Sequence, residues 1–167
     1  MMKIGKKLES MINKQINAEF YSAYLYLSMA AYFDSMNLGG FSNWMRVQAK
    51  EELGHGMKFY KFVYERGGVV KLDGIQKPKS EWNGPLTVFE EAYAHEVEVT
   101  KMINELFEVA KSEKDSATQV FLGWFIDEQV EEEASADAIV QKIKMVGEKG
   151  NALILLDHEL AKRGEGK

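Results

Sequence analysis

The stretch KEELGHGMKFY at residues 50–60 sets a glutamate and a histidine, Glu52 and His55, into an apolar helical pattern. One helix face, read at steps of three or four residues, carries Phe41, Met45, Gln48, Glu52, His55, Phe59 and Phe62. Because most of these neighbours are apolar, the carboxylate and the imidazole are predicted to point into a protein core. Buried glutamate is rare unless it has a partner, so the pattern needs a chemical reason.

Length and composition indicate an ordinary globular chain. With 167 residues, 46% of them hydrophobic, the chain can bury one sizeable core, and we expect a single domain over residues 1–167. The net charge of −5 argues against nucleic acid as a partner and mildly favours cations.

Cysteine is absent from the sequence, which excludes a disulfide framework and a thiolate metal site and suits a reducing compartment. The opening residues MMKIGKKLES lack the apolar region of a signal peptide. The longest aliphatic run, residues 152–156, is too short to span a bilayer. We therefore expect a soluble cytoplasmic protein that does not enter a membrane.

Helical periodicity recurs along the chain, and no strand alternation of useful length occurs, so the predicted fold class is all-α. We predict a bundle over about residues 3–146 and a short C-terminal helix, with helices at about 3–34, 40–66, 85–112, 115–146 and 151–162. Gly67-Gly68 is a typical helix stop, Pro85 suits a first turn, and Asp115 or Ser116 suits an N-cap. The buried face of the first helix is expected to carry Leu8, Ile12, Ile16, Ala23 and Leu27.

The connections between the helices predict their arrangement. The first and second helices are joined by a few residues, as are the third and fourth, so each pair should be antiparallel. The link at 67–84 has 18 residues and can extend roughly 60 Å, whereas a helix of about 27 residues spans about 40 Å. This link can cross the whole bundle. The second and third helices should then be parallel, in a four-helix bundle with one long crossover.

The fifth helix, about twelve residues long, is too short to be stable alone, so its apolar face must dock. It could pack on its own bundle or on neighbouring subunits. Because the four longer helices already close a core among themselves, we favour a contact between subunits.

Each of the four long helices interrupts its apolar stripe with acid, at Glu19, Glu52, Glu96, Glu128 and Glu132. Any one of them alone is most simply a solvated residue at the edge of the stripe, and a lone His55 is most simply a hydrogen-bonded core residue. Several buried carboxylates together would repel one another and take up protons, and no Lys or Arg occupies the same core positions. A cation from outside the chain is the simplest explanation.

The ligand types narrow the choice of cation. Carboxylate oxygens with one imidazole and no sulfur disfavour structural zinc and suit iron or manganese. Bundles with two such metals place one Glu on each of two helices and Glu-x-x-His on the other two. Glu19 and Glu96 fit the single positions, and Glu52 with His55 fits one paired motif. The fourth helix departs from this pattern, because no histidine follows its glutamates at the third position.

These motifs together resemble those of the non-haem bacterial ferritins, from the first helix through the short fifth helix. The resemblance rests on Glu19 with Tyr26 seven residues later, EELGH at 51–55, Glu96, and WFIDEQVEEE at 124–133. It implies a ferritin-like bundle with a di-iron centre. A first iron would be held by Glu19, Glu52 and His55. Glu52 would bridge to a second iron bound also by Glu96 and Glu132, with Gln129 close by.

The same resemblance implies a third iron site on the inner side of the bundle, with ligands Glu51, Glu128, Glu131 and Glu132. Tyr26 matches the family's site tyrosine, although its spacing alone also fits a half-buried core residue. Bacterioferritins carry a haem-binding methionine where this chain has Leu53, so no haem is expected. The absence of cysteine excludes the four-cysteine iron domain of rubrerythrins.

The function that the resemblance implies is iron storage with ferroxidase activity. Fe(II) would be oxidised by O2 or H2O2, and ferric mineral would be deposited inside a hollow homo-oligomer of 24 subunits, with the fifth helix near the fourfold axes. One alternative is a metal-buffering or structural shell subunit without oxidative activity. A di-metal oxygenase, peroxidase or manganese catalase is a further alternative, which the missing second Glu-x-x-His disfavours.

Overall fold

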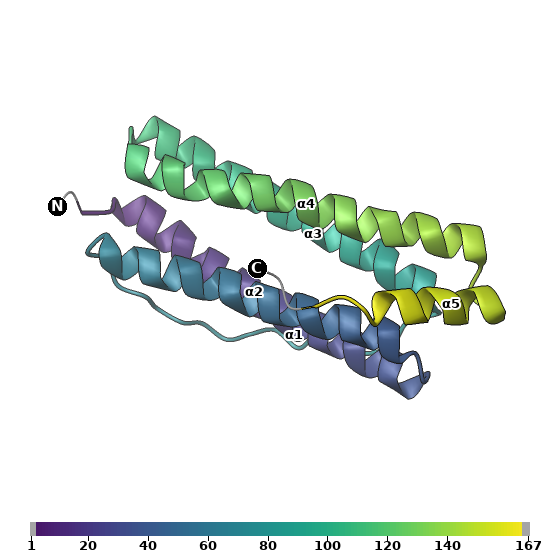
Figure 1. Cartoon of the computed structure of the whole chain (residues 1–167). Helices are drawn as coiled ribbons and strands as arrows, with labels where there is room; N and C mark the ends of the chain where they lie inside the picture. Colours follow the sequence, from purple (N-terminus) through teal and green to yellow (C-terminus); the bar gives the residue numbers. More distant parts are fainter. Residues whose placement is uncertain (1–2, 165–167) are drawn as a thin grey trace.

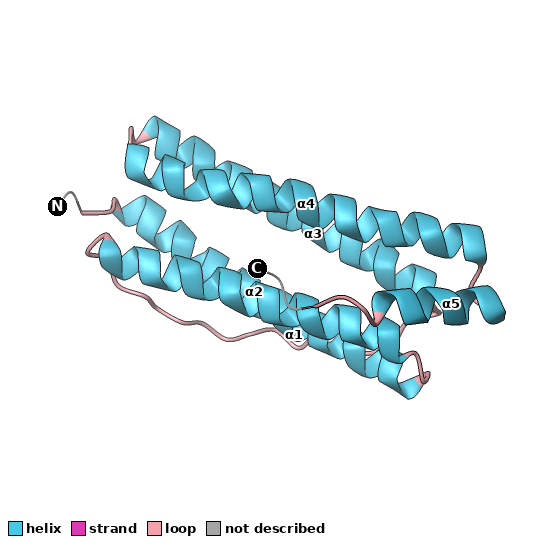
Figure 2. Ribbon diagram, viewed as in Figure 1, coloured by secondary structure: helices cyan, strands magenta, loops and turns pink. Residues whose placement is uncertain are grey.

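The computed structural model describes residues 3–164, which form five helices. Their bounds are α1 Lys6–Ser35, α2 Gly39–Glu65, α3 Pro85–Ser112, α4 Ser116–Val146 and α5 Asn151–Leu160. No strand occurs among these residues (Figure 2), which confirms the all-α prediction. The fifth helix ends two residues earlier than expected, because residues 161 and 162 form a turn.

Two antiparallel helical hairpins, α1 with α2 and α3 with α4, make up the bundle (Figure 1). The segment 67–84 runs along the outside of the first hairpin from one end of the bundle to the other, so α2 and α3 are parallel as predicted. Side chains of α1 hold this crossover. The Asn13 amide donates to Val69 O at 3.0 Å and accepts from Lys71 N at 2.7 Å, and the Ser28 hydroxyl donates to Lys79 O at 2.6 Å.

The helix ends form at the residues that the sequence marks. Gly67 has a φ of 66°, and Gly68 N donates to Val63 O at 2.9 Å, so a left-handed glycine closes α2. At the start of α4 the Asp115 carboxylate accepts from Thr118 N at 3.0 Å, which confirms the predicted N-cap.

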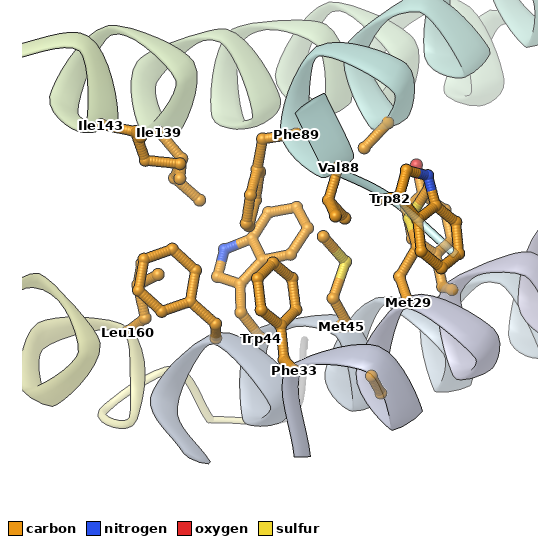
Figure 3. Close-up of a cluster of buried hydrophobic side chains, with 14 of the residues drawn as sticks. Met29, Phe33, Trp44, Met45, Trp82, Val88, Phe89, Ile139, Ile143 and Leu160 are labelled. Atoms are coloured by element: carbon orange, nitrogen blue, oxygen red, sulfur yellow. The ribbon is translucent and has the colours of Figure 1, made fainter. Parts of the chain in front are cut away.

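Two apolar clusters lie at the two ends of the bundle. One contains tilted and edge-to-face aromatic rings from α1, α2 and α3, including Phe33, Phe41, Trp44 and Phe89. Figure 3 shows Phe33, Trp44 and Phe89 among the side chains of this cluster. The other contains Leu8, Ile12, Ile16, Phe59 and Phe125 with their neighbours. Between the clusters, each of the four helices directs polar side chains into the core.

The predicted buried face of α1 was wrong in its second half. Leu27 is 50% exposed and Ala23 is only half-buried, whereas Tyr26 and Met29 are fully buried. The reason is helical drift. Tyr26 lies 18 residues, or about five full turns, after Leu8 and therefore returns to its face, which repeated steps of four residues overshoot.

Helix α5 folds back and packs on α2 and α4 of the same chain through Leu153, Leu156 and Leu160. Packing on its own bundle is the less favoured of the two possibilities that the sequence leaves open. Ile154 and Leu155, on the other side of α5, are 52% and 69% exposed. A contact of that side with neighbouring subunits stays a prediction.

Candidate metal centre

The polar stretch between the two apolar clusters is buried in spite of its charge. Glu19 of α1, Glu52 of α2, Glu96 of α3 and Glu132 of α4 are each 5% exposed or less, and His55 is 5% exposed. On every helix these residues stand between the side chains of one cluster and those of the other. Their predicted inward orientation is therefore confirmed for all four helices.

Two overlapping groups of potential ligands share Glu52. Glu19, Glu52 and His55 form one group, and Glu52, Glu96 and Glu132 form the other. In each group one ligand atom from every residue lies within 4.8 Å of the others. These are the two sets that the family resemblance implies for a pair of iron ions. Their role as ligands stays a prediction.

Hydrogen bonds to neutral side chains hold the carboxylates in place. Gln15 donates to Glu19 Oε1 at 2.7 Å, and the Tyr26 hydroxyl donates to Glu96 Oε1. Gln129, expected beside the second iron, donates at 3.2 Å to Glu96 Oε2. The Gln48 amide donates both to Glu52 Oε1 at 3.0 Å and to Glu132 Oε2 at 2.7 Å. These donors fix the carboxylates without supplying a positive charge.

One carboxylate oxygen is left without a partner. Among the residues described, Glu19 Oε2 is the single buried side-chain nitrogen or oxygen atom that makes no hydrogen bond. It lies 3.9 Å from His55 Nδ1, which also faces Glu52 Oε2 at 3.4 Å. A buried acceptor without a donor is costly. A cation between Glu19, Glu52 and His55 would satisfy this oxygen, so the donor set fits a metal ion.

Burial and mutual repulsion shift the acid–base behaviour of the whole group. Burial and the neighbouring Glu52 raise the pKa of Glu19 well above its ordinary value. Burial, with the charges of Glu96 and Glu132, does the same to the pKa of Glu52. Burial and Glu96 raise the pKa of Glu132 to about 8. A divalent cation would therefore compete with protons for these carboxylates.

The residues expected at a third iron site are only partly brought together. Glu128 joins His55 and Glu132 in a third group of potential ligands, with its Oε1 3.7 Å from His55 Nε2. Among the described residues, Glu51 and Glu131 belong to none of the three groups. Glu131 is exposed, and Glu51 is paired with Arg163 at 2.6 Å. Their role as ligands of a third iron ion stays a prediction.

Sequence reasoning missed the supporting roles of Gln15, Gln48 and Arg163. Gln15 and Gln48 each stand four residues before a core glutamate on the same helix face, so the i,i+4 spacing could have marked them. Arg163 gave no such signal, because it lies more than 100 residues from its partners Gln48 and Glu51. Tyr26, in contrast, was correctly placed beside the site, although its role there is untested.

An all-α bundle with one long crossover and a buried carboxylate cluster defines the class of ferritin-like proteins, and comparison with known proteins agrees. The family model described as Ferritin-like domain matches residues 9–146. The chain belongs to the ferritin family.

Relatives named bacterial non-heme ferritin align with almost the whole chain. One from Bacteroides fragilis (strain 638R) is 44% identical over 160 residues, which is 96% of this chain and 99% of that protein. One from Staphylococcus epidermidis (strain RP62A) is 41% identical over 160 residues, covering 96% of each.

Solved structures show the same fold. An open-pore ferritin from the hyperthermophilic archaeon Archaeoglobus fulgidus superposes with a TM-score of 0.96 at 59% identity, over 98% of this chain and all of that one. A humanized archaeal ferritin gives a TM-score of 0.97 at 58% identity, over 99% of this chain. These similarities support a metal-binding protein of iron storage that forms a homo-oligomer. None of the helices described here is long and apolar enough to cross a membrane.

Proposed function

We propose that this protein is a ferroxidase and iron store, which oxidises Fe(II) with O2 or H2O2 and deposits ferric mineral inside its own oligomeric shell. One observation carries the proposal. Two buried acidic groups share Glu52, and each offers its ligand atoms within 4.8 Å of one another. Such an arrangement suits a pair of ions bridged by one carboxylate. Iron is the substrate of the reaction and the cargo of the shell.

The residues have distinct proposed roles in holding this substrate. Glu19, Glu52 and His55 bind the first Fe(II), with Nδ1 of His55 facing the two carboxylates. Nε2 is then directed to Glu128, a carboxylate partner of the kind that orients metal-bound histidines. This geometry adds a positioning role for Glu128 to its expected role at a third site.

The second Fe(II) is held by Glu52, Glu96 and Glu132, with Gln129 beside Glu96. The carboxylates compensate the charge of both oxidation states of iron, which lowers the cost of oxidation. Each Fe(II) gives up one electron to the oxidant. Tyr26, which donates a hydrogen bond to Glu96, is the aromatic side chain beside the second iron position. The third iron position uses Glu51, Glu128, Glu131 and Glu132.

The proposed shell contains 24 copies of a chain that forms one ferritin-like domain over its whole length and acts in the cytoplasm. Exposed apolar side chains support contacts between copies. An almost entirely apolar groove on the outer face of α1 and α2 is lined by Leu27, Leu53 and Ile75, and α5 exposes Ile154 and Leu155. Surfaces of this kind are typical of protein interfaces.

Replacing the bridging residue tests the proposal. Glu52→Ala should abolish rapid aerobic Fe(II) oxidation, because it removes a ligand from both positions, while the fold survives or becomes more stable as repulsion is relieved. Stopped-flow oxygen uptake of metal-free protein mixed with Fe(II) measures the rate. Glu108→Ala, an exposed glutamate on α3, is the matched control and should behave as the wild type.

The alternative function, a metal-buffering or structural shell subunit, predicts a different result. The wild-type protein would then bind Fe(II) in air without taking up oxygen faster than buffer does. Undiminished oxidation by Glu52→Ala would instead show that the reaction occurs elsewhere on the protein.

A further inference from the structure

The segment that follows α5 lies over α2 (Figure 1). The Arg163 guanidinium in this segment contacts α2. Nη1 donates to Trp44 O at 3.3 Å, and Nη2 donates to Gln48 Oε1 at 2.8 Å and to Glu51 Oε2 at 2.6 Å. The guanidinium carbon lies 4.2 Å from the centre of a Trp44 ring. Residues 44, 48 and 51 share one helix face. This face of α2 therefore forms a fitted seat for one arginine, with stacking and hydrogen bonds together.

Gln48 connects that seat to the acidic centre. It is fully buried, its carbonyl oxygen accepts from Arg163, and its NH2 group donates to Glu52 and Glu132. Arginine has only donors, so its contact requires the carbonyl oxygen of the amide on its own side. The NH2 group must then face the two carboxylates. The two carboxylates that this amide links are both expected ligands of the second iron ion.

The position of Arg163 is itself fixed by the docking of α5. The Asp157 carboxylate accepts from Gly40 N at 2.8 Å and from Phe41 N at 2.9 Å, capping the first turn of α2 from a distant part of the chain. A Cβ on Gly40 would lie 1.6 Å from Asp157 O, so only glycine permits this approach. The Asn43 amide donates to Arg163 O at 3.0 Å. The backbone of Arg163 is thus held beside α2 by the contacts of Asp157 and by the hydrogen bond to its own carbonyl oxygen.

We propose that Arg163 is a positioning residue for the second iron position: through Gln48 it holds the Glu52 and Glu132 carboxylates in their binding geometry. The docked C-terminal segment thereby sets the affinity of that position. This inference rests on the function proposed above. Hydrogen-bonding partners behind the metal ligands commonly change metal affinity 10–100-fold when they are removed.

Titration of the assembled, metal-free protein with Co(II) tests this role without any oxidation. Co(II) is a redox-stable probe, its visible absorption reports coordination, and calorimetry gives the affinity of each bound ion. Arg163→Met should weaken the second ion, which uses both carboxylates held by Gln48, by about 10-fold. The first ion shares only Glu52 with it and should be weakened less. Arg163→Lys keeps the positive charge but lacks the several N–H donors of the planar guanidinium, so its affinity for the second ion should be intermediate.

A double-mutant cycle with Gln48→Met separates positioning from general loosening. If Arg163 acts through Gln48, the variant carrying both Arg163→Met and Gln48→Met should bind the second Co(II) no more weakly than Gln48→Met alone. Lys142→Met is the matched control. It removes the 2.5 Å ion pair of Lys142 with Glu159, which ties α5 to α4, and leaves Gln48 untouched. Its Co(II) affinities should equal those of the wild type.

The possible results are distinguishable. Two tightly bound Co(II) ions in both the wild type and Arg163→Met, with equal affinities, would overturn the role of Arg163 and leave the proposed function standing. Additive losses in the cycle, or a change confined to a third and weaker ion, would also overturn it. Failure of the wild type to bind two ions would overturn both proposals. If Arg163→Met does not assemble, Arg163→Lys enters the cycle in its place.

Discussion

Two buried polar regions of this bundle solve the problem of buried charge in opposite ways. Near one end, Arg66 of the α2 terminus meets Asp115 with two hydrogen bonds of 3.0 and 2.9 Å, and the same carboxylate caps α4. Midway along the bundle, four glutamates are paired with amides, a phenol and one imidazole. The first region carries its counter-charge within the chain. Within residues 3–164, the second has no cationic side chain of this kind, which suits a cation from outside the chain.

The acid–base behaviour of the two regions differs in the same sense. Burial pushes the pKa of Asp115 upward, but hydrogen bonds from Arg66 and Thr118 outweigh it and hold that pKa below its ordinary value. In the acidic centre, burial and neighbouring carboxylates both raise the pKa values of Glu19, Glu52 and Glu132. The Arg66–Asp115 region is therefore expected to stabilise the fold, and the acidic centre is expected to lower the stability of the metal-free protein.

The largest expected effect comes from breaking the self-contained pair. Arg66→Met leaves the Asp115 carboxylate buried without its arginine and should lower the free energy of unfolding by about 3–5 kcal/mol, with or without bound metal. Urea unfolding at fixed protomer concentration measures it. Arg46→Met, which breaks an exposed pair with Asp34, is the control and should cost at most about 1 kcal/mol. Equal losses in the two variants would contradict the comparison.

The pH dependence of stability should have opposite signs in the two regions. The pKa of Glu132 is raised from 4.5 to about 8. Its contribution to the stability of the fold is therefore fully present below pH 4.5 and is lost as pH rises through 8. Between these two pH values the free energy of unfolding of the metal-free protein should fall by about 1.4 kcal/mol per pH unit for one such group. Asp115, with its lowered pKa, contributes above its ordinary pKa and loses that contribution only as pH falls through the lowered value. Urea unfolding at pH 5.5 and 8 measures the slope, and a rise in stability across this range would contradict the sign.

Neutralising one carboxylate of the acidic centre should have a smaller effect, and one that is stabilising. Glu132→Gln removes a charge that is buried among like charges, so the metal-free protein should gain about 1–2 kcal/mol at pH 8.5, and its pH slope should flatten. The stabilisation that added Co(II) gives should shrink in the same variant. Glu133→Gln, the neighbouring glutamate that accepts from Thr100, is the control. A loss of stability in Glu132→Gln would show that this carboxylate already has an adequate partner.

The smallest expected change sharpens the role of Tyr26. Tyr26→Phe removes the donor to Glu96 and should cost about 1 kcal/mol of stability. Because the phenol is not needed as a ligand in our assignment, the number of bound Co(II) ions should stay the same. Calorimetry counts them, with Tyr24→Phe, half-exposed on the same helix, as the control. A lost ion in Tyr26→Phe would make the tyrosine part of the binding set.

Much of the acidic centre could be predicted from the sequence because helical periodicity is local. Steps of three, four and seven residues were enough to place Glu19, Glu52, Glu96 and Glu132 on core faces, and the structure buries all four. The same rule failed for Leu27, since steps of four accumulate an angular error along a 30-residue helix. Family resemblance, and not periodicity, supplied the pairing of these residues into two sets.

The sequence by itself determined the helices, the long crossover and the acid in the core, since propensity, turn residues and apolar spacing act over a few residues at a time. Only the tertiary structure decided which side of α5 is buried, where the tail lies, and that Arg163 reaches Gln48 and Glu51. Those contacts join parts of the chain more than 100 residues apart. They depend on how whole helices pack against one another. No spacing pattern in the sequence of either segment indicates that packing.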